Sequence, residues 1–196
     1  MTALAGTPPV KQLSGASRPA LIEHFLALSM EDLRLRFGRF MTPNALREYV
    51  DSIDFGRDAA FGIFNGELRL IGVAHVARIA DGAELGVSVV PGERGRGVGS
   101  ALFERAHTYA RNQLLRQLFM HCLTENKAMM HIARKSGMRI VAEAGEAAAY
   151  LRLPAADMAT VAQELLQERV ALFDIALKSQ LLAARRLAAT LQGHQP

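Results

Sequence analysis

The apolar and polar positions change from helical spacing to strand alternation near residue 59. Before that point, capping residues and apolar faces with helical spacing predict helices and one short strand. After it, β-branched runs and turn sequences predict an antiparallel meander. The elements expected in this half are a strand over 10–13, helices over 20–28 and 44–52, a helix start at Ser29, and strands over 59–64, 68–79 and 84–90, with turns at Asn65-Gly66 and Asp81-Gly82 and a bulge near Gly72.

The following segment predicts a crossover and then a hairpin. A strand placed after a crossover helix is expected to pair in parallel with strand 84–90. The elements expected here are a helix over 98–113, a strand over 117–123, a helix over 126–136 closed by Gly137, and strands over 138–144 and 147–153 joined across Gly145-Glu146. The order predicts an α+β, three-layer α/β/α fold with a mixed sheet over residues 10–153, preceded by a flexible leader over 1–9.

The pattern changes again after Pro154. Residues 155–192 contain no Gly or Pro, and their apolar positions step alternately by four and three. This spacing predicts one long helix with a heptad seam. The helix either packs on its own domain over part of its length or pairs with a second copy or another partner helix. The seam consists of Leu166, Val170, Phe173, Leu177, Gln180, Ala184, Leu187 and Leu191.

Composition narrows the function classes. Half of the residues are hydrophobic, and the net charge is only +4, without a basic run or a Trp that would indicate nucleic acid. The single Cys122 excludes an internal disulfide and is expected to be a buried, inert thiol. The six histidines lack metal-ligand spacing, so no metal is expected. Without a signal or membrane-spanning segment, a cytoplasmic protein is expected.

A glycine-rich loop follows the strand at 84–90. The loop Arg94-Gly95-Arg96-Gly97-Val98-Gly99-Ser100 comes after a Pro-Gly turn and leads into the predicted helix. Successive backbone N–H groups and the helix N-terminus provide partial positive charge, and Arg94 and Arg96 add full charges. These features are typical of a phosphate-binding loop. The alternatives are a flexible surface turn and, for the two arginines, solvated surface charge.

Two nucleotide-binding motifs fit this loop poorly. A P-loop requires Gly-Lys followed by Ser or Thr, which is absent, and a dinucleotide fingerprint requires a third glycine where Ser100 stands. The remaining pattern is Arg-x-x-Gly-x-Gly at Arg94, Gly97 and Gly99. A nicotinamide dinucleotide enzyme therefore remains only as an alternative.

The loop and a downstream motif together resemble the GNAT family of acyl-CoA-dependent acetyltransferases. The downstream motif is Asn126 opening a helix that ends in Lys135-Ser136-Gly137-Met138, with Met where the family has Phe. The resemblance covers roughly residues 10–153. The segments 32–37, 53–61 and 83–89 are in addition similar to bacterial protein lysine acetyltransferases that modify acyl-CoA synthetases.

The resemblance implies that acetyl-CoA lies between strands 84–90 and 117–123. The pantetheine would pair with the backbone of the first strand, and the pyrophosphate would bind the loop amides. Gly97 and Gly99 would let the phosphates approach the backbone closely, and Asn126 would serve the cofactor or cap its helix. The implied cofactor-binding residues are Val87, Val89, Val90, Arg94, Gly95, Arg96, Gly97, Val98, Gly99, Ser100 and Asn126.

Acetyl transfer to an amine requires a group that removes a proton from the nucleophile, and such a base contributes about 10²–10⁴ in rate. Glu84 is the candidate. Strand alternation places it on one face with Gly86 and Ser88, and these small residues should leave that face open. The resemblance points to the same residue, while an exposed carboxylate beside a turn is the alternative. The tyrosine that serves many family members as general acid aligns with Ala133.

Two points about function stay open in the sequence. Tyr109 and Tyr150 are expected in the core rather than at the site, and Arg34, Arg36 and Arg39 form either a solvated helical face or a basic cluster that favours an acidic substrate. The expected function is N-acetyl transfer from acetyl-CoA to a small amine or protein lysine. The alternative is a non-catalytic acyl-CoA-binding module that acts through the C-terminal helix.

Overall fold

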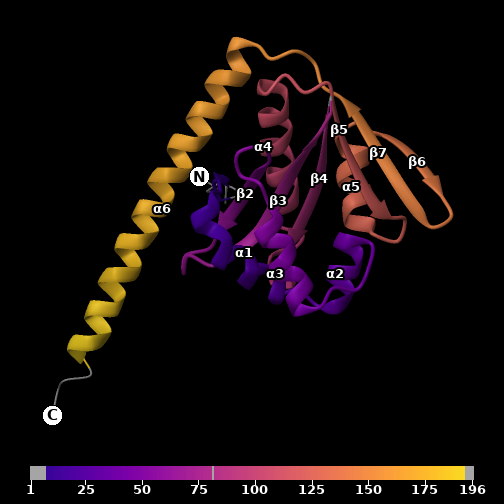
Figure 1. The fold of residues 1–196 in the computed structure, drawn as a ribbon. Coiled ribbons are helices and arrows are strands. Elements are labelled where there is room, and N and C mark those ends of the chain that lie inside the picture. Colours follow the sequence, from indigo (N-terminus) through magenta and orange to yellow (C-terminus); the bar gives the residue numbers. More distant parts are fainter. Residues whose placement is uncertain (1–7, 81, 193–196) are drawn as a thin grey trace.

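The computed structural model describes residues 8–80 and 82–192. Its centre is a seven-stranded mixed sheet in the order β1-β2-β3-β4-β5-β7-β6, with helices on both faces (Figure 1). Most of the predicted leader and the predicted turn residue Asp81 lie outside the described residues. The strands are β1 Lys11–Gln12, β2 Ala59–Phe64, β3 Leu70–Ile79, β4 Gly82–Val89, β5 Gln117–Leu123, β6 Arg139–Glu143 and β7 Glu146–Arg152.

Several helices begin at the capping residues that the sequence predicts. Ser29 and Thr42 accept hydrogen bonds from backbone N–H groups in the first turns of α2 and α3, and Asn126 does the same for α5. Gly137, with φ of 69°, follows the end of α5 in the left-handed region that ends many helices. The helices are α1 Arg18–Leu26, α2 Met30–Phe37, α3 Pro43–Ser52, α4 Val98–Asn112, α5 Lys127–Lys135 and α6 Met158–Gln192, and the 3₁₀ turns are η1 Gly15–Ser17 and η2 Pro91–Glu93.

The sheet is antiparallel except between β4 and β5. These two strands pair in parallel over only three residues, from Gly82 opposite Gln117 to Glu84 opposite Phe119. Beyond Glu84 the strands no longer pair, while β5 continues its pairing with β7 on the other side. The sequence prediction of parallel pairing is confirmed, and its early end leaves an opening in the sheet.

Two predicted turns are wrong in detail. The β2–β3 connection is a five-residue loop over 65–69, in which the Asn65 side chain accepts hydrogen bonds from the N–H groups of Glu67 and Arg69. These side-chain bonds stabilise a longer loop than a two-residue Asn-Gly turn. In the β6–β7 hairpin, the two turn residues with positive φ are Ala144 and Gly145, one position earlier than predicted. The predicted bulge near Gly72 is confirmed by a register shift in the β2–β3 pair.

Apolar side chains fill both spaces between the sheet and its helices. One core lies against α4 and α5 and contains Phe61, Leu85 and Leu102. The other lies against α1–α3 and includes Phe25 and Leu46. The sheet is therefore the middle layer of the predicted three-layer, α+β fold, and both of its central faces are covered.

The long helix α6 leaves the domain along one side (Figure 1). It spans 35 residues, which is about 52 Å at 1.5 Å per residue. Its contacts with the domain involve α4 and β1 and extend to Lys178, whose Nζ donates to the Phe64 carbonyl over 2.8 Å. The helix therefore packs on its own domain over the first part of its length, as one of the two alternatives predicted.

The face of α6 that packs is different from the heptad seam. Thr160 and Ala171 are buried on the domain side. The seam residues Leu166 and Phe173, by contrast, are 65% and 72% exposed. The sequence identified the apolar periodicity correctly, but the seam points to solvent.

Candidate active site

Two adjoining pockets occupy the opening between β4 and β5. One, of about 620 Å³, lies beside the glycine-rich loop and the N-termini of α4 and α5. The other, of about 390 Å³, lies between Glu84 and Gly86 of β4 and the end of β5. Arg36 lines both pockets, so its side chain stands where they meet.

The loop pocket has the geometry of an anion site. Gly95 and Gly97 adopt left-handed φ values of 73° and 81°, and residues that have a Cβ adopt such values only with strain. Gly97 is also the N-cap of the fifteen-residue helix α4, whose free N–H groups face the loop. A Cβ on Gly99 would lie 3.2 Å from Ile132 Cδ1, so a glycine there allows α5 to pack close to α4.

Most of the predicted cofactor residues line this pocket. They are Val87, Val89, Arg94, Gly95, Gly97, Val98, Gly99, Ser100 and Asn126. Two others do not line it. Arg96 is exposed and forms an ion pair with Glu93 over 2.7 Å, and Val90 packs against the core.

Helix α2 crosses the opening and is tied to both of its sides. Arg94 forms an ion pair with Asp32 over 2.8 Å, and Arg34 forms one with Glu125 over 2.6 Å. The Asn126 side chain donates to the carbonyl of Leu35 in α2 while it caps α5. These contacts hold α2 over the loop pocket and place Arg36, on the same helix, inside the opening.

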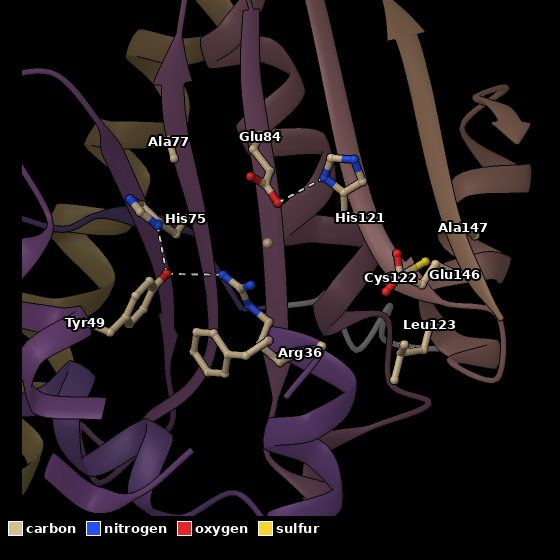
Figure 2. A pocket seen from close by; sticks show the side chains of 13 residues that line it. Arg36, Tyr49, His75, Ala77, Glu84, His121, Cys122, Leu123, Glu146 and Ala147 are labelled. Carbon is tan, nitrogen blue, oxygen red and sulfur yellow. Dashed lines mark hydrogen bonds and ion pairs between the residues drawn. The ribbon is translucent and has the colours of Figure 1, made fainter. Parts of the chain in front are cut away.

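Glu84 lies in the smaller pocket, as Figure 2 shows. Its side chain is 46% exposed, and its Oε1 lies 3.5 Å from Nδ1 of His121 on β5. The carboxylate is therefore accessible to a substrate and lies at the point where the two strands separate. Glu146 is the second acid lining this pocket.

The face of β4 that carries Glu84 is covered further along, contrary to the prediction that it is open. The Arg36 guanidinium occupies the space over Gly86, where a Cβ would overlap it. Next to it, the hydroxyl of Ser88 donates to Nε2 of His24 over 2.8 Å, while Nδ1 of His24 donates to the Leu70 carbonyl. Gly86 and Ser88 are small because side chains from the N-terminal helices pack on them.

Burial lowers the pKa of His24 to about 4, and the nearby charge of Arg36 adds to this effect against the opposing hydrogen bond to Leu70. His24 is therefore neutral near pH 7. The neutral ring fits both contacts, because Nδ1 then donates to the Leu70 carbonyl and Nε2 accepts from the Ser88 hydroxyl.

A chain of polar side chains reaches Arg36 from the far wall of the smaller pocket. Nη2 of Arg36 donates to the Tyr49 hydroxyl over 3.2 Å, and that hydroxyl lies 2.8 Å from Nδ1 of His75 (Figure 2). Nε2 of His75 faces the buried carboxylate of Asp58 at 3.7 Å. Burial lowers the pKa of His75 to about 4, Arg36 lowers it further, and Asp58 opposes the shift.

Tyr49, His75 and Asp58 were not among the residues predicted at the site. These residues lie on or beside three different elements, and no local motif connects them. For Arg36 a signal existed in the cluster of Arg34, Arg36 and Arg39. Of these three, only Arg36 reaches the smaller pocket, while Arg39 is exposed.

Three other residues singled out in the sequence are buried, whereas Tyr150, also expected in the core, is only half-buried. Tyr109 is 9% exposed and packs edge-on against Phe61. Ala133 is fully buried, and Cys122 is a buried free thiol whose pKa is raised by burial. The prediction of a core Tyr109 and a buried thiol is confirmed.

Comparison with known proteins identifies the family. A family model described as an acetyltransferase (GNAT) domain matches residues 17–139. The chain belongs to the GNAT acetyltransferase family. The domain is consistent with an acetyl-CoA-dependent N-acetyltransferase, and GNAT enzymes use acyl-CoA. A search of curated protein sequences gives no significant match.

Solved structures show the same GNAT fold. The GNAT domain of S. lividans PAT superposes with a TM-score of 0.64 at 21% identity, covering 74% of this chain and 89% of that one. A spermidine N-acetyltransferase from Vibrio cholerae, in complex with CoA and spermine, gives 0.57 at 18% identity, covering 74% and 94%. A single-residue mutant of a cAMP-binding acyltransferase from Mycobacterium smegmatis gives 0.54 at 22% identity, covering 85% and 51%.

Neither a metal-binding cluster nor a membrane-spanning helix is found in the described part of this GNAT protein. No group of His, Cys, Asp and Glu among residues 8–80 and 82–192 has an arrangement that could hold a metal ion. Over the same residues, no helix combines the length and apolar character that a membrane span requires.

Proposed function

We propose that this protein transfers an acetyl group from acetyl-CoA directly to a primary amine, with Glu84 as general base. The observation that carries the proposal is the pair of adjoining pockets at the β4–β5 opening. One is lined by the phosphate-binding loop, and the other contains an accessible carboxylate. A cofactor and an acceptor could therefore meet in one ternary complex.

The polar groups of the loop pocket suit the chemical groups of acetyl-CoA. The backbone N–H groups of Gly97 through Ser100 and the N-terminus of α4 suit a pyrophosphate, and Arg94 lies beside them. The backbone of β4 beyond Glu84 is unpaired on its β5 side and suits the amide groups of a pantetheine arm. Arg96 does not line the loop pocket, so it could contact only those parts of the cofactor that lie at the entrance of the pocket.

In the proposed reaction, the neutral amine nitrogen attacks the thioester carbonyl carbon, the new C–N bond forms, and the C–S bond breaks. The proton that the nitrogen loses after the attack passes to the departing CoA thiolate, so the products are the amide and CoA. Glu84 or a water molecule that it binds accepts the proton that the ammonium must lose. A primary amine agrees with the two carboxylates in the lining, Glu84 and Glu146, which favour a cation beside them. Either a small amine or a protein lysine could present such a group.

The test replaces Glu84 by Gln and measures CoA release over a panel of amines and proteins. Turnover with any active acceptor should fall by about 10²–10⁴, while acetyl-CoA affinity stays the same. Glu48→Gln is the matched control and should change turnover by less than about threefold, because the exposed Glu48 lines neither pocket. Unchanged turnover in Glu84→Gln removes Glu84 from this role. Tight acetyl-CoA binding without turnover for any acceptor would instead support the non-catalytic module.

We further propose that the exposed seam of α6 pairs with α6 of a second copy. The seam residues Leu166, Val170, Phe173, Leu177 and Leu187 are each 46–72% exposed and follow heptad spacing. Such a stripe suits knobs-into-holes packing against an identical helix, and Gln180 would help to fix the register.

Light scattering of Phe173→Glu tests this pairing. A dimeric wild type should become monomeric in this variant, because the charge would be buried in the seam. Leu172→Glu is the control, since Leu172 is also 46% exposed but lies off the seam. A wild-type protein that is monomeric at all concentrations examined contradicts the proposal.

A further inference from the structure

Arg36 occupies an unusual position in the candidate site. Its guanidinium lies over Gly86, in the opening between β4 and β5, and borders both pockets. If acetyl-CoA and the acceptor bind as proposed above, the thioester and the attacking amine meet at this junction. The charge of Arg36 is therefore next to the reacting atoms.

The partners of Arg36 are neutral. Nη2 donates to the Tyr49 hydroxyl, and the guanidinium lies over the ring of Phe37 at 4.8 Å from its centre. Nε is buried and has no hydrogen-bond partner. Among residues 8–80 and 82–192, no carboxylate lies within ion-pair distance of this guanidinium. By contrast, Arg34 forms ion pairs with two carboxylates and Arg94 with one.

The surrounding side chains hold Arg36 in place and do not neutralise it. Tyr49 accepts a hydrogen bond from Arg36 and can donate one to Nδ1 of His75, and α3 and β3 hold these two rings. His75 is uncharged near pH 7 because its pKa is about 4. The acids that face the pocket, Glu84 and Glu146, make no ion pair with Arg36. A planar guanidinium that is fixed and unpaired suits a carboxylate, which it can bind with two parallel hydrogen bonds.

We infer that Arg36 binds a carboxylate carried by one of the two substrates, beside the reacting carbonyl. The carboxylate has two sources. It is either the far end of a dicarboxylic acyl group on CoA, such as succinyl, or the carboxylate of an amino-acid-like acceptor. The inference rests on the proposed acetyl-CoA and acceptor pockets and names the chemical class of substrate that they prefer.

The first arm of the test measures binding by calorimetry with acetyl-CoA and succinyl-CoA. If the carboxylate belongs to the acyl group, the wild type binds succinyl-CoA about tenfold more tightly than acetyl-CoA. In Arg36→Met the ratio of the two affinities falls to about one, whereas Arg36→Lys keeps part of the preference. Arg39→Met is the matched control, because Arg39 is exposed on the same segment and lines neither pocket.

The second arm compares two acceptors that differ by a carboxylate, 4-aminobutanoate and butylamine, with acetyl-CoA as donor. If the carboxylate belongs to the acceptor, kcat/KM favours 4-aminobutanoate about tenfold or more in the wild type and in Arg39→Met, and the ratio falls to about one in Arg36→Met. Gly86→Ala is a second variant, since its Cβ displaces the guanidinium without removing it. It should lose the same preference.

The outcomes separate the inference from the proposal on which it rests. A carboxylate preference in either arm that depends on Arg36 supports the inference and identifies the source. Binding of acetyl-CoA with turnover, but no such preference in either arm, overturns the inference and leaves the acetyltransferase intact. Failure of every CoA ester to bind overturns both.

Discussion

Arg105 and Arg36 both stack on an aromatic ring, but they differ in their contacts with carboxylates. Arg105 on α4 is 1% exposed and lies over Phe61 at 4.6 Å, and half-buried Arg36 lies over Phe37 at 4.8 Å. In both, Nε is buried without a hydrogen-bond partner. Arg105, however, contacts two carboxylates, whereas Arg36 contacts none among the described residues.

The difference shows how this chain separates a structural charge from one that is open to a ligand. The acids of Arg105 are Glu164 and Glu168, both on α6, at 2.9 and 3.5 Å. Glu164 also accepts from the side chain of Asn112, and Glu168 from the backbone of Gln12. The buried cation thus fixes α6 to α4 and β1 and has its anions supplied by the chain. Arg36 faces a pocket, and its anion must come from outside.

The largest loss of stability is expected when the two carboxylates that contact Arg105 are removed. Glu164→Gln with Glu168→Gln leaves a buried guanidinium without a counter-charge, which costs about 3 kcal/mol of unfolding free energy. Urea unfolding at pH 7 measures this change. Adding Arg105→Met to the double variant should recover much of the loss, because no unpaired charge then remains.

The exposed Glu48 is the control for this prediction, and Glu48→Gln should leave stability within about 0.5 kcal/mol. If the double variant loses no more stability than this control, the two carboxylates do not stabilise the buried charge of Arg105. The contrast with Arg36 would then disappear.

The loop half of the site could be predicted because its signals are local. Gly95 through Ser100 form one continuous segment, and the backbone conformation that they permit is the property that binds an anion. Asn126 likewise caps the helix that follows it. Helix and strand order followed from capping and periodicity in the same way. Of the two turns that were wrong, one differs in its length and the other in its position.

The acceptor half could not be predicted because its contacts are distant in sequence. Arg36 and Tyr49 are 13 positions apart, and Tyr49 and His75 are 26 apart. No periodicity shows which of three neighbouring arginines enters a pocket, because the answer depends on how α2 crosses the β4–β5 opening. For the same reason the seam of α6 was visible in the sequence, but the side it faces was not.

The next largest effect is a loss of folding stability at acid pH, which two buried histidines cause. The folded pKa values of His24 and His75 are about 4, below the ordinary value of 6.5, so the unfolded chain binds more protons between these values. Stability is therefore full above pH 6.5 and is lost as pH falls toward 4, by about 2 kcal/mol per histidine between pH 7 and pH 5. Burial is the main cause for both, and the charge of Arg36 adds to both.

Arg36→Met should reduce this acid sensitivity, because removing the charge raises both folded pKa values toward 6.5. We expect the stability lost between pH 7 and pH 5 to shrink by about 1 kcal/mol, measured by urea unfolding at each pH. Around His75, the charges of Asp58 and Arg57 and the hydroxyl of Tyr49 are unchanged in the variant. Identical pH profiles for Arg36→Met and the wild type would show that the Arg36 charge does not reach the histidines.

The smallest effect is expected on stability itself at pH 8, where both histidines are neutral with or without Arg36. Arg36→Met keeps the length of the side chain and loses one hydrogen bond to Tyr49 and one cation–π contact with Phe37, which together contribute about 1 kcal/mol. Removing a shielded cation that has no anion offsets much of this loss. The unfolding free energy should therefore change by less than about 1 kcal/mol, because groups kept for a ligand are commonly neutral or unfavourable for stability. A loss near 3 kcal/mol would place Arg36 with Arg105 as a structural charge, and its lack of a carboxylate would then no longer indicate a substrate.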